Sequence, residues 1–283
     1  MKTIKIGGVP EHFNLPWHHC MENGKFEAED VHLIWKDFPE GTGAMCKALR
    51  SGELDAAVIL TEGIVKDIIQ GNDSKIIQTF IGSPLIWGIH VAAGSPFKNI
   101  QELEGTKAAI SRKGSGSHLM AYVNASNQNW DLSKLNFEIV NNLDGAVHAL
   151  KEDQAQYFMW EHFTTKPLVD NKTFRLVADC PTPWPCFVIA ARNESIRMHP
   201  QRLKKMLEVV NKETRNFKLR KNIDQELSRR YDQKLEDIRK WLDLTHWSQE
   251  QISPEDLENV QKTLENLKLI GHKKDYSDLC ATV

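Results

Sequence analysis

Two short loops combine glycines with hydroxyl side chains, a composition suited to holding a small polar or anionic group. They are PEGTG (residues 39–43) and KGSGS (residues 113–117), the second lying within SRKGSGSHLM (residues 111–120). Each precedes a predicted helix, so backbone N–H groups and a hydroxyl would meet a carboxylate, sulfonate or phosphate at the positive end of the helix dipole. Either loop alone is better explained as a turn or a helix cap than as a binding site. Their occurrence at corresponding places in two halves of the chain favours a binding role.

Aromatic and acidic residues occupy similar positions, after predicted strands. Aromatic rings can sandwich planar or cationic groups, and carboxylates can hold amines. The alternative for each tryptophan is core packing, and for each glutamate a surface or capping role. Hydroxyls and amides fit an anion whereas glutamates fit an amine, so a zwitterion or a heterocycle stays open as the ligand. The residues concerned are Trp17, Trp87, Trp160, Trp184, Glu11, Glu62 and Glu161.

Sequence signatures of several enzyme classes are missing. The glycine loops lack the Gly-Lys-Ser/Thr ending of a P-loop and the glycine spacing of a dinucleotide site, and no G-x-S-x-G elbow occurs. The segment WHHC (residues 17–20) places two histidines side by side, where a helix points them about 100° apart and away from a common metal ion. We therefore expect no metal site, and we expect His12 and His118 to act as hydrogen-bonding groups.

Composition describes a globular chain of 283 residues with 41% hydrophobic and 26% charged residues. The formal net charge of −2 argues against nucleic acid or an anionic membrane as a partner. No apolar run is long enough to span a bilayer, and the start MKTIKIGGVP indicates a strand rather than a signal peptide. We expect a cytoplasmic protein, or a periplasmic one if a leader has been trimmed. Five irregularly spaced cysteines predict reduced thiols.

Strand and helix signals alternate along most of the chain. Strands are predicted at residues 31–38, 54–60, 74–81 and 85–93, with a helix in GTGAMCKALRSG (residues 41–52). A second unit begins near Pro96 with a short helix, a glycine stop at Gly105 and a strand leading into SRKGSGSHLM. Such βαβ alternation predicts α/β architecture with parallel sheets covered by helices.

The two halves show a short internal similarity. GAMCKALRSGELDAAVIL and DGAVHALKEDQAQYFMWE both place a glycine before a helix, carry an Ala-Leu pair, turn, and enter an apolar strand. This pattern predicts two lobes built on one plan, although coincidence of two βα units is the alternative.

From about Asn193 the pattern becomes helical and charged. The segment SPEDLENVQKTLENLKLIG predicts a helix with Ser253 as N-cap and Pro254 at the first position, ending at Gly271. We expect these helices to pack on the first lobe. The mixed-charge run KLRKNIDQELSRRYDQKLEDIRK (residues 218–240) is interpreted as a solvated helical face.

Several segments together resemble a known family. GKFEAEDVHLIWKDFPEGTGAMCKALRSGELDAAVILTEG is similar to the first lobe of type II periplasmic-binding-protein folds, in the branch of nitrate, sulfonate, taurine and thiamin-pyrimidine precursor binders. NIQELEGTKAAISRKGSGSHLM resembles the family's entry into the second lobe. EHF, FPEGTG, LTEG, SPLIW, FMWEHFTTKPLVD and PTPWPCF resemble a narrower leaderless, apparently cytosolic subgroup from fungi and bacteria.

The resemblance implies a two-lobed α/β protein with two crossing hinge segments, at residues 86–93 and 187–192. Lobe one would comprise residues 1–90 together with 189–283, which include the C-terminal helices, and lobe two residues 91–188. A small polar or charged organic ligand would be trapped in the cleft between lobes by hinge closure.

The same resemblance implies a substrate-binding protein like those of ABC transporters rather than an enzyme, with no cofactor and no metal. An ABC permease would be its partner if it is exported, and we expect a monomer. The alternative is an enzyme related to thiamin-pyrimidine precursor synthesis, whose cysteine-rich iron motif is missing here. The implied ligand-binding residues are Pro10, Glu11, His12, Thr42, Gly43, Thr61, Glu62, Trp87, Ser115, Gly116, Ser117, His118, Trp160, Glu161 and Trp184.

Overall fold

The computed structural model describes residues 3–283 and divides the chain into two compact units. Unit 1 contains residues up to 84 and from 183 onward, and unit 2 contains residues 85–182. The expected boundaries, after residues 90 and 188, each lie six residues later. The difference arises because strand β5 (Ile86–Ala92) pairs wholly within the unit 2 sheet and strand β10 (Phe187–Arg192) wholly within the unit 1 sheet.

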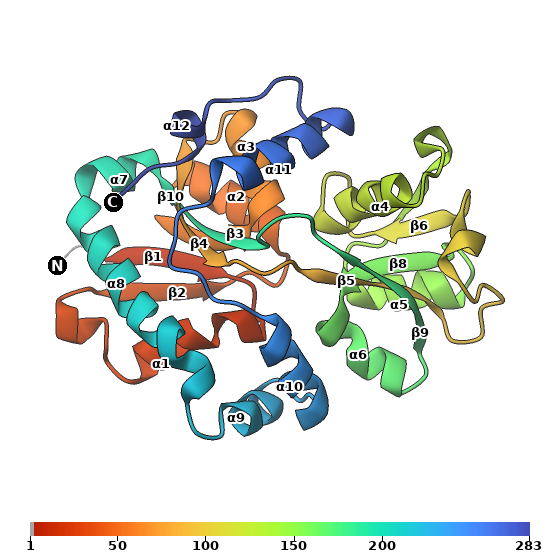
Figure 1. The fold of residues 1–283 in the computed structure, drawn as a ribbon, viewed down its shortest axis with the longest axis horizontal. Helices are drawn as coiled ribbons and strands as arrows, with labels where there is room; N and C mark the ends of the chain where they lie inside the picture. Colours follow the sequence, from red (N-terminus) through yellow and green to blue (C-terminus); the bar gives the residue numbers. More distant parts are fainter. Residues whose placement is uncertain (1–2) are drawn as a thin grey trace. The chain divides into compact units, whose positions relative to one another are not determined.

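Unit 1 is built on a five-stranded sheet in the order β2-β1-β3-β10-β4 (Figure 1). The remaining strands are β1 (Ile4–Gly8), β2 (Leu33–Asp37), β3 (Ala56–Leu60) and β4 (Ser74–Ile81). β1 runs parallel to β2 and β3, whereas β10 is antiparallel to β3 and β4. Strand β3, with the sequence AAVIL, is almost completely buried, as its unbroken apolar run requires of a central strand.

Nine α-helices surround this sheet within the described part of unit 1. Helix α3 packs on both α2 and α11, and α1 packs on α8. The helices are α1 (Leu15–Glu22), α2 (Thr42–Ser51), α3 (Thr61–Ile69), α7 (Asn193–Met198), α8 (Pro200–Asn216), α9 (Ile223–Arg230), α10 (Leu235–Leu244), α11 (Pro254–Asn266) and α12 (Tyr276–Leu279). Short 3₁₀ turns lie at His12–Asn14, Glu27–Glu29 and Phe217–Leu219.

Unit 2 repeats the plan with the strand order β7-β6-β8-β5-β9 (Figure 1). Its other strands are β6 (Lys107–Ile110), β7 (Asn136–Ile139), β8 (Tyr157–Glu161) and β9 (Phe174–Pro181). Its helices are α4 (Gly116–Asn127), α5 (Leu143–Lys151) and α6 (His162–Asp170), with 3₁₀ turns at Ile100–Leu103 and Leu132–Lys134. β6 is parallel to β7 and β8, and β5 is antiparallel to β8 and β9. One of the two similar sequence segments forms α2 and β3, and the other forms α5 and β8. Strands β3 and β8 are each the third strand of their sheet.

Three sequence-based expectations are corrected by these elements. The sheets are mixed rather than parallel, because the fourth strand of each runs against its neighbours. Helix α11 starts as expected, with the Ser253 hydroxyl accepting from the Asp256 N–H at 3.0 Å, but it ends at Asn266 and not at Gly271. The run at residues 218–240 is not simply a solvated face, because Leu227 and Ile238 are fully buried.

Candidate functional site

The residues predicted to bind ligand lie at the carboxyl ends of parallel strands, or beside them, in each unit. In α/β sheets this edge is where loops lead into helices and where ligands bind. In unit 1 the loops after β1, β2 and β3, and the segment before β10, contribute Pro10, Glu11, His12, Thr42, Gly43, Thr61, Glu62 and Trp184. In unit 2 the loop after β6, the end of β8 and the start of β5 contribute Trp87, Ser115, Gly116, Ser117, His118, Trp160 and Glu161.

Glu62 and Trp184 form a direct pair in unit 1. The Trp184 indole Nε1–H donates to Glu62 Oε2 at 2.9 Å, and both side chains are 2% exposed. The other carboxyl oxygen, Oε1, is buried without a hydrogen-bond partner in the described part of the chain. Burial raises the pKa of Glu62 to about 7, although its own backbone N–H and the Trp184 indole oppose the rise. Glu62 is therefore a buried acceptor with one unused oxygen.

Thr61, beside Glu62, joins the end of β3 to the segment before β10. The Thr61 hydroxyl donates to the Pro185 carbonyl, and the Thr61 N–H donates to the Cys186 carbonyl at 3.0 Å. A Cβ atom at Gly63 would lie 2.3 Å from the Thr42 methyl carbon. Glycine at position 63 thus lets the first turns of α2 and α3 touch, which brings Thr42 and Gly43 next to the turn that carries Glu62.

His12 lies in a buried aromatic cluster after β1. Its ring stacks on Trp241 with centroids 4.1 Å apart and planes 13° apart, and it meets Phe13 edge-on and Tyr231 at a tilt. Both ring nitrogens are buried without hydrogen-bond partners among residues 3–283. Burial lowers the pKa of His12 to about 3, so the imidazole is neutral. Neighbouring Pro10 is exposed and Glu11 is half-buried.

Tyr231 and Trp241 were not predicted from the sequence as neighbours of His12. Tyr231 lies within the charged run at residues 218–240, and Trp241 follows it directly. The helical spacing of Ile238, Trp241 and Leu242 was the available signal, since it predicts one buried helix face. These residues fix the His12 ring from the far end of the sequence.

The hydroxyl loop of unit 2 is organised around Ser117. Ser117 Oγ accepts from the Ser111 N–H at 3.0 Å and lies 3.1 Å from Ser115 Oγ. Ser115 caps helix α4, with Oγ accepting from the His118 N–H at 3.4 Å. The His118 ring accepts from the Gly114 N–H at 3.0 Å through Nδ1. The hydroxyls of Ser115 and Ser117 therefore make hydrogen bonds within the loop itself. Ser117 is 1% exposed and accepts the hydrogen bond that joins the loop to Ser111, directly after β6.

Trp87, Trp160 and Glu161 meet at one edge of the unit 2 sheet. Trp87 pairs with Glu161 in register, and the Trp87 and Trp160 rings are 6.4 Å apart at 74°. Glu161 caps α6, because its Oε2 accepts from the Thr164 N–H at 2.6 Å and from the Thr164 hydroxyl at 2.7 Å. Burial raises the pKa of Glu161, while the Thr164 hydrogen bonds act against that rise. The buried Trp87 Nε1–H has no partner among residues 3–283.

His19, the second histidine of WHHC, hydrogen-bonds to two glutamates. The two ring nitrogens of His19 lie 3.2 Å from Glu213 Oε1 and 2.5 Å from Glu226 Oε1. Glu213 also accepts from Lys25 and Arg220. Across residues 3–283 no group of three or more metal-ligating side chains converges. The arrangement at both strand edges is suited to hydrogen bonding and stacking.

Comparisons with known proteins agree with this architecture. Residues 87–180 match the model of the Ca3427-like periplasmic-binding-protein family. The structure of the CA3427 gene product of Candida albicans is similar with a TM-score of 0.88 and 23% identity, covering 100% of this chain and 97% of that one.

Two sulfonate-binding proteins are also similar in structure. The periplasmic aliphatic sulphonate-binding protein SsuA of Escherichia coli gives a TM-score of 0.79 at 16% identity, covering 100% of this chain and 92% of its own. The alkanesulfonate-binding protein SsuA of Xanthomonas axonopodis pv. citri, bound to MOPS, gives 0.83 at 13% identity, covering 99% and 98%. No curated protein matches the chain.

Between residues 3 and 283, no helix has both the length and the hydrophobicity to cross a bilayer. Each sheet is mixed, because its fourth strand, β10 or β5, runs antiparallel to its neighbours. The similarity to the solved structures extends over the whole chain and so includes both sheets. The chain has the type II periplasmic-binding-protein fold, and its residues 87–180 carry the pattern of the Ca3427-like family.

Proposed function

We propose that the chain binds a small polar organic molecule without transforming it. The observation that carries this proposal is the match to solute-binding proteins over the whole chain. Two sheets with the same strand order, each with polar and aromatic groups at its carboxyl edge, support it.

Binding is favoured over catalysis by the groups present at these edges. Glu62 Oε1 and both His12 ring nitrogens are buried without hydrogen-bond partners among residues 3–283, whereas the hydroxyls of Ser115 and Ser117 are used within their own loop. An enzyme of the thiamin-precursor type would draw on an iron-binding cysteine cluster, and no such cluster lies among residues 3–283. The similar proteins are named for what they bind.

The proposal is tested on the purified full-length protein by native mass spectrometry and thermal denaturation. We expect a co-purified small molecule, and a lower melting temperature after it is removed, because a ligand that binds only the folded state stabilises it by mass action. Turnover of the recovered molecule by the protein would support the enzyme alternative. A bound molecule that leaves the melting temperature unchanged would contradict specific binding.

The cellular location decides which partner is relevant. We propose that the protein works in the cytoplasm as a carrier or sensor, and that an ABC permease becomes its partner if the protein is exported. Cell fractionation with antibodies to the native protein separates these cases. A periplasmic or extracellular pool would direct the search to a permease encoded nearby.

A further inference from the structure

Glu62 lacks the partners that a buried carboxyl ordinarily has. It lies in the first turn of α3 and is 2% exposed. Helix α3 directly follows the central strand β3 (Figure 1). The protein satisfies Oε2 with the Trp184 indole and leaves Oε1 without a partner. No lysine, arginine or histidine between residues 3 and 283 lies within ion-pair distance of this carboxyl, in contrast to buried Glu213.

An unused acceptor of this kind is costly to keep. Leaving a buried polar atom without a hydrogen bond costs about 1–3 kcal/mol, and more for a charged group. Buried carboxylates in proteins are therefore normally paired with a cation or with several N–H donors. The Trp184 bond is made to Oε2, which leaves Oε1 without a partner among residues 3–283. The missing partner of Oε1 is thus expected to come from outside residues 3–283.

A second unpartnered group lies at the same sheet edge. His12 follows β1, which pairs directly with β3, and neither of its ring nitrogens has a partner among residues 3–283. Stacking on Trp241 holds the ring in place. A neutral imidazole offers one N–H donor and one acceptor. The Trp241 Nε1–H also has no partner among residues 3–283, so the carboxyl edge of the unit 1 sheet presents unused donors as well as unused acceptors.

We propose that Glu62 Oε1 recognises an N–H donor of a nitrogen base, such as an amine, amidine or amino-substituted heterocycle. The inference rests on the proposed function and adds the chemical class of its ligand. It separates this chain from sulfonate binders above about pH 7, where Glu62 is ionised. A sulfonate offers no donor to Oε1 and would be repelled by the buried carboxylate.

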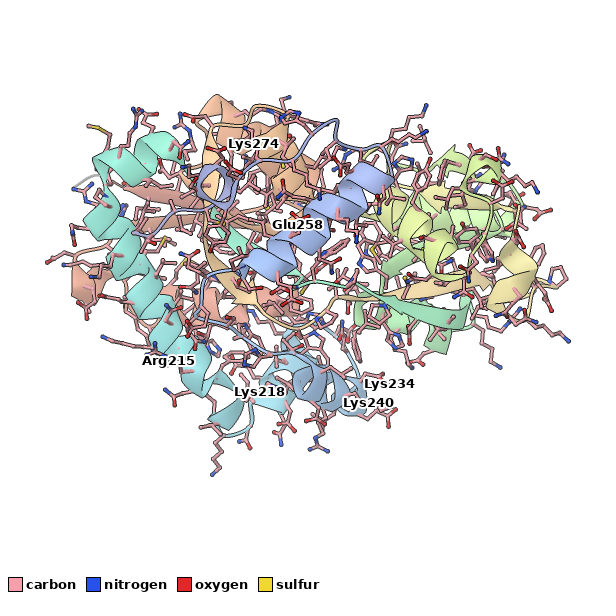
Figure 2. The ribbon with its side chains drawn as sticks, turned by 45° about the horizontal axis from the view of Figure 1, so that its top comes forward. Arg215, Lys218, Lys234, Lys240, Glu258 and Lys274 are labelled. Carbon is pink, nitrogen blue, oxygen red and sulfur yellow. The ribbon has the colours of Figure 1, made fainter. Side chains whose placement is uncertain are left out.

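The test compares two sets of probes on the full-length protein after dialysis. Butylamine, benzamidine and 2-aminopyridine represent the nitrogen bases, and ethanesulfonate and methylphosphonate represent the anions. Binding is measured by calorimetry at one ionic strength for the parent, Glu62→Gln and the control Glu258→Gln. Glu258 lies on α11 (Figure 2). Its exposed side chain pairs with Lys273, so the control makes the same chemical change outside the strand edge.

We expect at least one nitrogen base to bind the parent and the Glu258→Gln control equally. Glu62→Gln keeps the size of the side chain but loses its charge, and we expect its affinity to fall about 10- to 100-fold, the value of a hydrogen bond to a charged group. Circular dichroism confirms that the variant is folded.

Three outcomes overturn the inference, and they separate it from the proposed function. Binding of the anions alone, or binding of a nitrogen base that Glu62→Gln leaves unchanged, overturns the inference while the solute-binding function stands. Failure of both probe classes, together with no co-purified molecule, overturns the function and the inference together.

Discussion

Replacing Glu62 by glutamine is expected to remove a large part of the pH dependence of stability near neutrality. Burial raises the pKa of this carboxyl from 4.5 to about 7 in the folded protein. Between these values the folded state keeps a proton that the unfolded state has released. Folding stability therefore falls as the pH rises from about 4.5 through 7, and the fall is complete above the folded-state pKa.

The size of the effect follows from the shift. A difference of about 2.5 pK units corresponds to about 3 kcal/mol of unfolding free energy. In a chain of this size that amounts to a melting-temperature difference of about 6 °C. Glutamine at position 62 has no proton to lose. From about pH 4.5 to pH 8, the unfolding free energy of Glu62→Gln is therefore expected to rise by about 3 kcal/mol relative to that of the parent.

The assay is thermal denaturation of dialysed parent, Glu62→Gln and Glu258→Gln across this pH range. Other titrating groups, including the histidines, contribute equally to all three proteins and cancel in the differences. Glu258→Gln is expected to follow the parent, because the Glu258 side chain is 58% exposed and pairs only at the surface. Parallel pH profiles for the parent and Glu62→Gln would refute the reasoning, since they would mean that Glu62 is ionised at its ordinary pKa.

Three further substitutions test the structural roles of other polar residues, each by urea denaturation. Glu213→Gln is expected to cost about 3 kcal/mol at neutral pH. Hydrogen bonds from His19 and Lys25 outweigh burial and lower the pKa of Glu213 to about 2, so the difference from the parent fades as the pH falls from about 4.5 toward 2. Glu161→Ala removes the cap of α6 and is expected to cost about 1 kcal/mol, and an unchanged urea midpoint would contradict the cap. Ser117→Ala is expected to cost about 1–3 kcal/mol, because the buried Ser111 N–H loses its acceptor, and a neutral result would show that the loop has another support.

Local sequence patterns were sufficient to place strands, helices and most loop residues. The apolar run before Thr61 and the Ser115 cap before a helical segment are short-range signals, so their positions at strand ends could be predicted. The resemblance of several segments to one family added the two-lobed plan. Strand direction was the part that local pattern could not supply, because β5 and β10 read as ordinary apolar strands whichever way they run.

The partners of the candidate residues depend on contacts between distant parts of the sequence. Trp184 lies 122 positions after Glu62, and Trp241 follows His12 by more than two hundred residues. No periodicity or spacing links such pairs, since they arise only when β10 and the C-terminal helices return to the unit 1 sheet. Sequence reasoning could thus nominate Glu62 and Trp184 separately, but not as a pair.

The contrast between Glu62 and Glu161 shows why hydrogen-bond partners decide function where residue type does not. Both glutamates are buried, Glu62 just after β3 and Glu161 as the last residue of the corresponding strand β8, so the sequence suggested one role for both. Glu161 is engaged by the N–H and hydroxyl of Thr164, which come from the helix that it caps. Glu62 receives one indole N–H, and no residue of its own helix supplies a side-chain donor for the second oxygen. Substituting Glu161 should therefore act on stability through the loss of the helix cap, whereas substituting Glu62 should change both the pH dependence of stability and the choice of molecules that bind.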